Sequence, residues 1–443
     1  MQHCDILIKP RWCVTGEGQL TVHEEHAVAV TDGKIAAILP NAEAERLFQP
    51  SRSVERPGHI LIPGLVNAHA HSAMTLFRGF ADDLPLETWL RERIWPAEKR
   101  WMGPEFVRDG TALAIAEMLR AGVTCFADQY FYPEIVANTA VDLNIRAVIA
   151  TSVLDFETEW ANDATEYLQK GADLVHDAYA DHPLITTAFA PHSTGMLADE
   201  TFTALRVMAD QLDSPVQIHL HETQTEISHE LKRTGLRPVA RLTSLGLVNR
   251  SLLAVHAVHL QDDEMELFAE SGVSIAHCPR SNLKLASGIA PVRRYLDAGL
   301  NVAIGTDGAA SNNVLDILLE VQTASLLAKA AGEDASNLDA YESLAMATLA
   351  GARALGLDAI TGSIAAGKWA DLACVDLSAP NSQPVYDPVS SLIYSARATQ
   401  VSDVWVAGRH QVENGELTEI DVAAIAARAN EWSHQIRLQR EAK

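Results

Sequence analysis

The chain has 443 residues, 48% of them apolar, so it exceeds an average single domain and allows a sizeable core. It carries 34 basic residues against 58 acidic ones, and the formal net charge of −24 repels phosphate backbones and anionic membrane surfaces. We therefore expect neither nucleic acid nor a membrane as a partner.

The cysteines and the lengths of the apolar runs indicate the cellular compartment of the protein. The first residues, MQHCDILIKPRW, lack the apolar region of a signal peptide, and no later apolar run reaches membrane-spanning length. The cysteines are scattered and never in CxxC spacing, which is typical of reduced thiols. They are Cys4, Cys13, Cys125, Cys278 and Cys374. We expect a cytoplasmic protein.

Residues 1–59 alternate short strand-like runs with turn signals. DILIKPRWCVTGEG and HAVAVTDGKIAAIL are such runs, and Asp32-Gly33 in the second is a good hairpin turn. Residues 369–443 repeat the pattern in VSDVWVAGRHQVENGEL and end in a stretch with helical spacing. The two ends of the chain could therefore form one β module.

Residues 60–368 alternate apolar strand-like runs with longer helical segments. The runs are HILIPGLVNAHAH, VTCFADQ, RAVIATSVLD, LITTAFAPHS, VQIHLHE, LLAVHAVHL, VSIAHCP and NVAIGTDG. Eight buried strands that alternate with helices predict an α/β fold, a (β/α)8 TIM barrel. Polar side chains follow the C-terminal ends of these runs, which form the active-site face of this fold. If the register is right, they converge there: His69, His71, His192, His219, His256 and Asp307.

Two histidines separated by one residue end the first of these runs. Alternate side chains of a strand share a face, so His69 and His71 point the same way and indicate a metal site. His219 and Asp307 would complete three histidines and a carboxylate around one ion, although Asp307, before a glycine, could instead cap a turn. This pattern is typical of a catalytic zinc with an open position, with iron or manganese as alternatives.

Other histidines of these runs have open roles. His221 shares a strand face with His219, and strand position favours His219 as the ligand. His256 could be another ligand, a core residue, or a group that orients a metal-bound water, and we favour the last. His192 follows a proline at a strand end and could hold substrate.

The segments NAHAH, HLHE, VHAVH and GTDGAASNN resemble motifs of the amidohydrolase superfamily, across essentially the whole chain. MTLFRGFADDLPLETWL and SNLKLASGIAPV are similar to the branch that holds 5′-methylthioadenosine/S-adenosylhomocysteine deaminases, with triazine chlorohydrolases and guanine deaminases as relatives. The resemblance implies a barrel with a split β-sandwich from both termini. We therefore expect three parts: residues 1–59 and 369–443 in the sandwich, the latter with a C-terminal helix, and residues 60–368 in the barrel.

The resemblance also implies one zinc ion, held by His69, His71, His219 and Asp307. Members with two metals use a carboxylated lysine at the end of the fourth strand. No lysine occurs between Lys170 and Lys232, so we expect a mononuclear site.

By the same resemblance, the reaction is hydrolytic deamination of an adenine nucleoside. Asp307 would accept a proton from the water, His256 would hydrogen-bond the attacking oxygen, and Glu222 would protonate the ring nitrogen. All three are expected catalytic residues, and Glu222 and Asp307 also contact the substrate.

Three further residues are expected to bind substrate. Glu98 matches the family residue that accepts hydrogen bonds from the two ribose hydroxyls, although its type and place would also suit a solvated helix face. His192 would bond the purine. Trp89 could pack on the nucleoside or belong to the core.

The substrate's 5′ tail is where this sequence departs from the family. Members that accept S-adenosylhomocysteine are expected to hold its carboxylate with arginines after the third strand, where Thr151 and Ser152 stand here. No arginine occurs between Arg146 and Arg206, so we expect 5′-methylthioadenosine as the better substrate, with S-adenosylhomocysteine or adenosine weaker. The alternatives are a triazine or nucleobase aminohydrolase or chlorohydrolase and a non-catalytic barrel scaffold; a homo-oligomer is left open.

Overall fold

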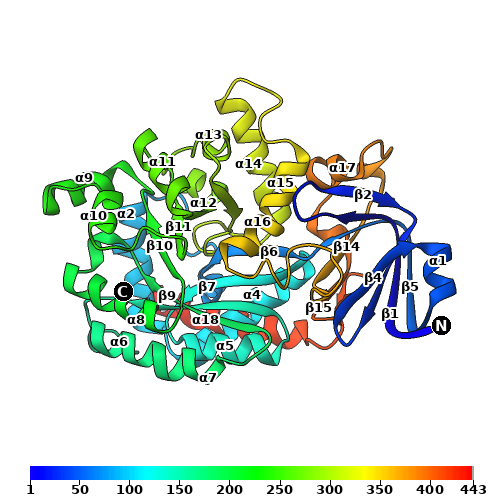
Figure 1. Ribbon diagram of the computed structural model, residues 1–443. Coiled ribbons are helices and arrows are strands. Elements are labelled where there is room, and N and C mark those ends of the chain that lie inside the picture. Colours follow the sequence, from blue (N-terminus) through cyan, green and yellow to red (C-terminus); the bar gives the residue numbers. More distant parts are fainter. Residues whose placement is uncertain (442–443) are drawn as a thin grey trace. The chain divides into compact units, whose positions relative to one another are not determined.

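The strand-like runs at the two ends of the chain pair with each other in one mixed sheet. The computed structural model describes residues 1–441. In it, β5 (Phe48–Pro63) pairs in parallel with β1 (Gln2–Thr15) and antiparallel with β14 (Leu372–Asp376) (Figure 1). The sheet order is β17-β16-β15-β14-β5-β1-β3-β4, with β2 beside β1. The β module expected from both termini is therefore confirmed.

The other strands of this sheet follow the predicted turns. Asp32 and Gly33 have φ of 50° and 74°, as a tight hairpin turn requires. The remaining strands are β2 (Thr21–Glu24), β3 (His26–Thr31), β4 (Lys34–Pro40), β15 (Val401–Val406), β16 (Arg409–Glu413) and β17 (Glu416–Leu417). The compact unit that contains the sheet spans Met1–Asn67, Glu117–Cys125 and Asp316–Ile420. Its helices are α1 (Asn41–Leu47), α14 (Ile317–Ala331), α15 (Ala340–Met346), α16 (Leu349–Ala354) and α17 (Pro388–Tyr394), with short 3-10 turns η5 (Pro380–Ser382) and η6 (Ala398–Gln400).

Eight strands form a nearly closed parallel barrel in the order β13-β12-β11-β10-β9-β8-β7-β6. They are β6 (Leu65–Ala70), β7 (Val123–Tyr130), β8 (Arg146–Val153), β9 (Ile185–Pro191), β10 (Val216–Leu220), β11 (Leu252–His256), β12 (Ser274–His277) and β13 (Asn301–Ile304). Beyond β13, the Asp307 N–H donates to the His69 carbonyl of β6 at 3.0 Å, which ties the two end strands together. The predicted (β/α)8 barrel is confirmed.

The first apolar run serves both sheets rather than one strand. Its residues up to Pro63 end β5 of the mixed sheet, and β6 of the barrel begins at Leu65. Gly64 lies between them, and a Cβ there would come within 2.1 Å of the Thr124 hydroxyl oxygen. A glycine is required because the backbone passes so close to Thr124.

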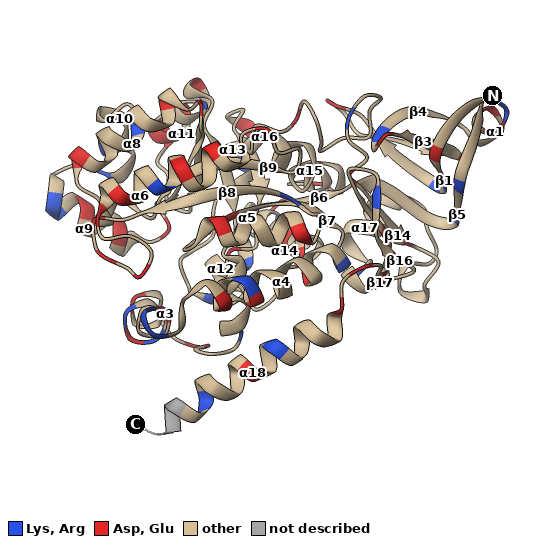
Figure 2. Cartoon of the chain, turned by 90° about the horizontal axis from the view of Figure 1, so that it is seen from below, with Lys and Arg blue, Asp and Glu red and all other residues tan. Residues whose placement is uncertain are grey.

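The second compact unit spans Ala68–Ala116, Phe126–Leu315 and the residues from Asp421 onward. Many Asp and Glu residues lie along its helices (Figure 2). Among the described residues, no helix combines the length and the apolar composition that a membrane span requires. The helical segments after the barrel strands are η1 (Ser72–Phe77), α2 (Leu86–Thr88), η2 (Trp89–Ile94), α3 (Trp95–Trp101), α4 (Pro104–Arg120), α5 (Pro133–Asp142), α6 (Ala164–Lys170), η3 (Gly171–His176), α7 (Asp177–Tyr179), η4 (Thr194–Met196), α8 (Asp199–Gln211), α9 (Gln224–Thr234), α10 (Pro238–Ser244), α11 (Asp262–Ser271), α12 (Pro279–Lys284) and α13 (Val292–Asp297).

The helical spacing at the end of the sequence corresponds to α18 (Val422–Glu441). Its Arg428 and Trp432 both bond the Asp109 carboxylate of α4, at 2.8 and 2.9 Å. This last helix is therefore anchored on α4 within the second unit.

Candidate metal centre and substrate cavity

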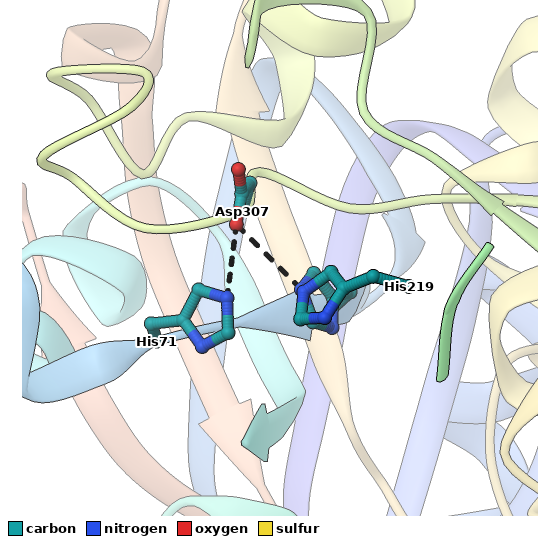
Figure 3. Close-up of side chains that lie close together, drawn as sticks. His71, His219 and Asp307 are labelled. Atoms are coloured by element: carbon teal, nitrogen blue, oxygen red, sulfur yellow. Dashed lines mark hydrogen bonds and ion pairs between the residues drawn. The ribbon is translucent and has the colours of Figure 1, made fainter. Parts of the chain in front are cut away.

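Three imidazoles and one carboxylate converge at the C-terminal ends of the barrel strands. His69 lies in β6 one residue before its end, His71 follows that strand, His219 lies in β10, and Asp307 follows β13. One ligand atom from each lies within 4.8 Å of the others. Asp307 Oδ1 is 3.1 Å from His71 Nε2 and 3.6 Å from His69 Nε2. Figure 3 shows His71, His219 and Asp307 turned toward one another.

Backbone carbonyls fix the tautomers of two of these histidines. His71 Nδ1–H donates to the Gln129 carbonyl at 2.5 Å, and His219 Nδ1–H donates to the His192 carbonyl at 2.8 Å. Each bond at Nδ1 leaves Nε2 as the ring nitrogen that faces the centre, the position from which histidine can bind a metal.

His69 and His219 face each other at the centre with neutral rings. Their Nε2 atoms are 3.2 Å apart, and burial lowers the pKa of His69 to about 4 and holds that of His219 well below its usual range. Both rings are neutral at pH 7, the charge state in which an imidazole binds a metal. Three imidazoles and one carboxylate fit Zn²⁺.

Asp307 is held in a left-handed conformation, with φ of 60°. Its Oδ2 accepts hydroxyl hydrogen bonds from Ser281 at 2.6 Å and Ser311 at 2.7 Å, so Oδ1 is the oxygen that faces the histidines. Although burial raises the pKa of Asp307, hydrogen bonds with His69 and His71 outweigh it and hold the pKa well below its usual range. The carboxylate is therefore ionised at neutral pH.

Glu222 and His256 lie beside the four candidate ligands. Glu222 Oε1 accepts from the Ser287 hydroxyl at 3.1 Å, and its Oε2 is 3.9 Å from His256 Nε2. Burial raises the pKa of the Glu222 carboxyl, which favours a group that carries a proton. His256 Nδ1 lies 2.9 Å from Asn282 Oδ1, a contact that leaves Nε2 as a proton acceptor.

A cavity of about 700 Å³ opens over the centre and is lined by each of the three residues expected to bind substrate. Glu98, in α3, is buried rather than solvated, and its Oε1 accepts from the Tyr130 hydroxyl at 2.8 Å. Burial raises the pKa of Glu98 to about 7. Trp89, at the start of η2, is also buried in the cavity wall, and the His192 ring lies 4.7 Å from that of His219. Eight of the nine residues singled out from the sequence line this cavity, and the ninth, His69, lies beneath it in the candidate metal group. The eight are Glu98, Trp89, His192, Glu222, His256, His71, His219 and Asp307.

Sequence reasoning missed several residues that support these groups. Tyr130 holds Glu98, and Ser281, Asn282 and Ser287 hold Asp307, His256 and Glu222. The last three lie in the segment SNLKLASGIAPV, whose resemblance to the deaminase branch was the sequence signal that could have pointed to them. Their individual roles depend on hydrogen bonds that only the tertiary structure reveals.

The residues around the expected tail site also differ from the sequence expectation. Ser152 lines the cavity, whereas Thr151 lies on the other face of β8, where its methyl carbon would be 3.0 Å from a Cβ placed on Gly171. Basic residues of the helical segments η2, α3 and α9 reach the wall: Arg91, Lys99 and Arg233. Arg233 is paired with Glu230 at 2.8 Å.

The amidohydrolase family model matches residues 60–410. In sequence the chain is similar to the 5-methylthioadenosine/S-adenosylhomocysteine deaminase of Teredinibacter turnerae, with 43% identity over 436 residues that cover 98% of each chain. A deaminase of the same name from Saccharophagus degradans is 40% identical over 436 residues, again 98% of each chain.

Two solved structures extend this similarity. An adenosine deaminase from Xanthomonas campestris with bound zinc matches with a TM-score of 0.97 at 50% identity, covering 99% of both chains. An atrazine chlorohydrolase from Arthrobacter aurescens TC1, complexed with zinc, matches with a TM-score of 0.90 at 28% identity, covering 96% of this chain and 99% of the other.

Proposed function

The chain belongs to the amidohydrolase family and is a hydrolase that acts on C–N bonds, and from this premise we propose that it deaminates 5′-methylthioadenosine. The 6-amino group of the purine is replaced by oxygen and leaves as ammonia. S-adenosylhomocysteine and adenosine are weaker substrates. The observation that carries the proposal is the buried Glu98–Tyr130 pair, which faces the same cavity as the candidate metal centre and suits a ribose diol.

We assign one zinc ion per chain to His69, His71, His219 and Asp307, and Fe²⁺ or Mn²⁺ would suit the same donors. When bound, zinc supplies the Lewis acidity that activates a water molecule at neutral pH. The support is the donor set itself, in which the Nε2 atoms of His71 and His219 face the centre because their Nδ1 atoms are bonded to backbone carbonyls.

The protein's own groups move the protons. Asp307 Oδ1 accepts a proton from the attacking water, and His256 Nε2 forms a hydrogen bond with that water and holds its oxygen in place. Glu222, whose carboxyl pKa is raised by burial, donates a proton to the ring nitrogen next to the reacting carbon. This proton offsets the negative charge that develops on the ring as the oxygen adds.

The remaining wall residues orient the nucleoside. The Glu98 carboxylate accepts hydrogen bonds from the 2′ and 3′ hydroxyls, and the Tyr130 hydroxyl fixes its orientation. His192 bonds the purine edge, and Trp89 packs on the nucleoside. Because each of these residues is buried or lies beside the metal ligands, little rearrangement is required on binding.

Preference for the methylthio tail follows from the outer wall of the cavity. Leu154, Phe156 and Met196 supply apolar surface, whereas Glu157 and Glu159 repel a tail carboxylate. The basic wall residues that could attract it are Arg91, Lys99 and Arg233, and the pairing of Arg233 with Glu230 weakens its attraction.

A spectrophotometric screen tests the function, because conversion of adenine to hypoxanthine changes the ultraviolet absorbance. We expect the highest kcat/KM for 5′-methylthioadenosine, about tenfold or more above that for S-adenosylhomocysteine. Atrazine and guanine are assayed in the same screen. The similarity to an atrazine chlorohydrolase makes triazine hydrolysis the second candidate function. Turnover of a triazine without turnover of any nucleoside would overturn the proposal, and so would a zinc-loaded protein that turns over neither.

A further inference from the structure

Three side chains of one short segment reach three different groups of the site. The segment Ser281–Ser287 comprises most of α12 and the turn after it. The Ser281 hydroxyl donates to Asp307 at 2.6 Å, Asn282 Oδ1 accepts from His256 Nδ1 at 2.9 Å, and the Ser287 hydroxyl donates to Glu222 at 3.1 Å. The three side chains belong to residues that are 0%, 1% and 5% exposed, so water does not compete for these bonds.

The segment is itself held firmly. The Leu285 N–H donates to the Ser281 carbonyl at 2.9 Å, and the Ser287 N–H donates to the Asn282 carbonyl at 2.8 Å. On the far side, His259 Nε2 donates to the Ser287 carbonyl at 2.7 Å. The segment is followed by Gly288, whose φ of 131° is a backbone conformation that residues with a side chain rarely adopt.

Each contact selects one state of the group it touches. Ser281, together with Ser311, occupies Oδ2 of Asp307, so the carboxylate offers a single oxygen to a metal. Asn282 accepts the Nδ1–H of His256 and thereby leaves Nε2 unprotonated on the side of Glu222. The Ser287 hydroxyl binds one Glu222 oxygen and leaves the other, Oε2, toward His256.

We propose that Ser281–Ser287 is a positioning element that sets a metal ligand, a proton acceptor and a proton donor together. Ser281 acts on metal retention, Asn282 on the His256 tautomer, and Ser287 on proton delivery by Glu222. The Asn282 and Ser287 roles rest on the proposed deaminase function, whereas the Ser281 role requires only that a metal binds.

The first experiment measures zinc retention, which needs no substrate. Zinc-loaded Ser281→Ala, Ser311→Ala and the double variant are mixed with a chromogenic chelator, and the rate and extent of zinc transfer are recorded. We expect the double variant to bind zinc about 10- to 100-fold more weakly, because its carboxylate is no longer oriented. Ser214→Ala is the matched control: this buried hydroxyl bonds the Thr187 carbonyl at 3.2 Å, outside the site, and its loss should leave zinc binding unchanged.

The second experiment separates the other two contacts. Ser287→Ala should keep its zinc and lower kcat about tenfold with little change in KM. Because the serine hydroxyl stabilises ionised Glu222, its removal raises the pKa of that carboxyl, and the basic limb of the kcat–pH profile should move to higher pH. Asn282→Asp, which keeps an acceptor for His256 Nδ1–H, should retain more of kcat than Asn282→Ala.

Three results would overturn the proposal. They are a double serine variant that releases zinc as slowly as Ser214→Ala, a Ser287→Ala variant with an unmoved pH profile, and equal kcat losses in both Asn282 variants. If Ser281→Ala does not fold, Ser311→Ala alone still removes one of the two hydrogen bonds to Asp307 Oδ2 and so tests whether they support zinc binding. If no nucleoside is turned over, the zinc measurement still decides the Ser281 role, so failure of the proposed function is distinguishable.

Discussion

Glu222 differs from the metal ligands in what its loss should do. It contacts Ser287 and faces His256, but its carboxylate is not among the four donors of the centre. Glu222→Gln should therefore keep the metal and lower kcat about 10²- to 10⁴-fold, since only proton delivery is removed. Steady-state kinetics check the predicted fall in kcat, and elemental analysis of the same preparation checks that the metal is retained. Near-normal turnover would rule out its role as proton donor.

Glu98 should confer a pH dependence on ribose recognition. Burial raises the pKa of its carboxyl to about 7, so the ionised form, which accepts two hydroxyl hydrogen bonds, becomes dominant only above that pH. The ratio of kcat/KM for adenosine to that for 2′,3′-dideoxyadenosine should rise as pH increases through about 7.

In Glu98→Gln the same ratio should be smaller by about 10- to 100-fold and independent of pH, because the neutral amide cannot ionise. Parallel pH profiles for the two nucleosides in the unmodified protein would contradict this assignment.

At the scale of elements, the sequence predicted most of what positions the site. Periodic apolar runs indicated the eight barrel strands, and strand-end polar residues such as His69 and His219 were found because the ends of parallel strands converge. The division of the first run at Gly64 was not predicted, since an apolar stretch does not reveal which of two sheets buries it. The link from Ser281 to Asp307 was missed as well, because it joins side chains 26 positions apart through tertiary structure alone.

The two faces of β8 provide a test of the tail site. Ser152 lines the cavity and Thr151 does not, so Ser152→Arg should introduce a cation that pairs with the tail carboxylate of S-adenosylhomocysteine. We expect kcat/KM for that substrate to rise about tenfold, with a smaller effect on 5′-methylthioadenosine.

Thr151→Arg is the matched control for this substitution. It places the same charge against Gly171 on the other face of the strand, so it should destabilise the fold without improving the substrate. Equal gains from both variants would mean that the charge acts at long range and not by pairing.

For the whole molecule, we expect about one zinc per chain. Among residues 1–441, a single group of histidine, cysteine and acidic side chains has ligand atoms close enough to share an ion. Elemental analysis should give about one equivalent, and His69→Ala or His219→Ala should lose both the metal and the activity. Two firmly bound ions in each active chain would contradict the mononuclear assignment.

The pairing of β5 with β14 has a consequence for folding during synthesis. Leu61 of β5 lies opposite Cys374 of β14, so one edge of β5 has no partner until the ribosome has added the entire barrel sequence. At ordinary rates of translation of about 5 to 20 residues per second, that edge of β5 remains unpaired for roughly 15 to 60 s. An unpaired strand edge is a template for pairing with other chains. The nascent N-terminal segment therefore needs protection from aggregation until β14 has been synthesised.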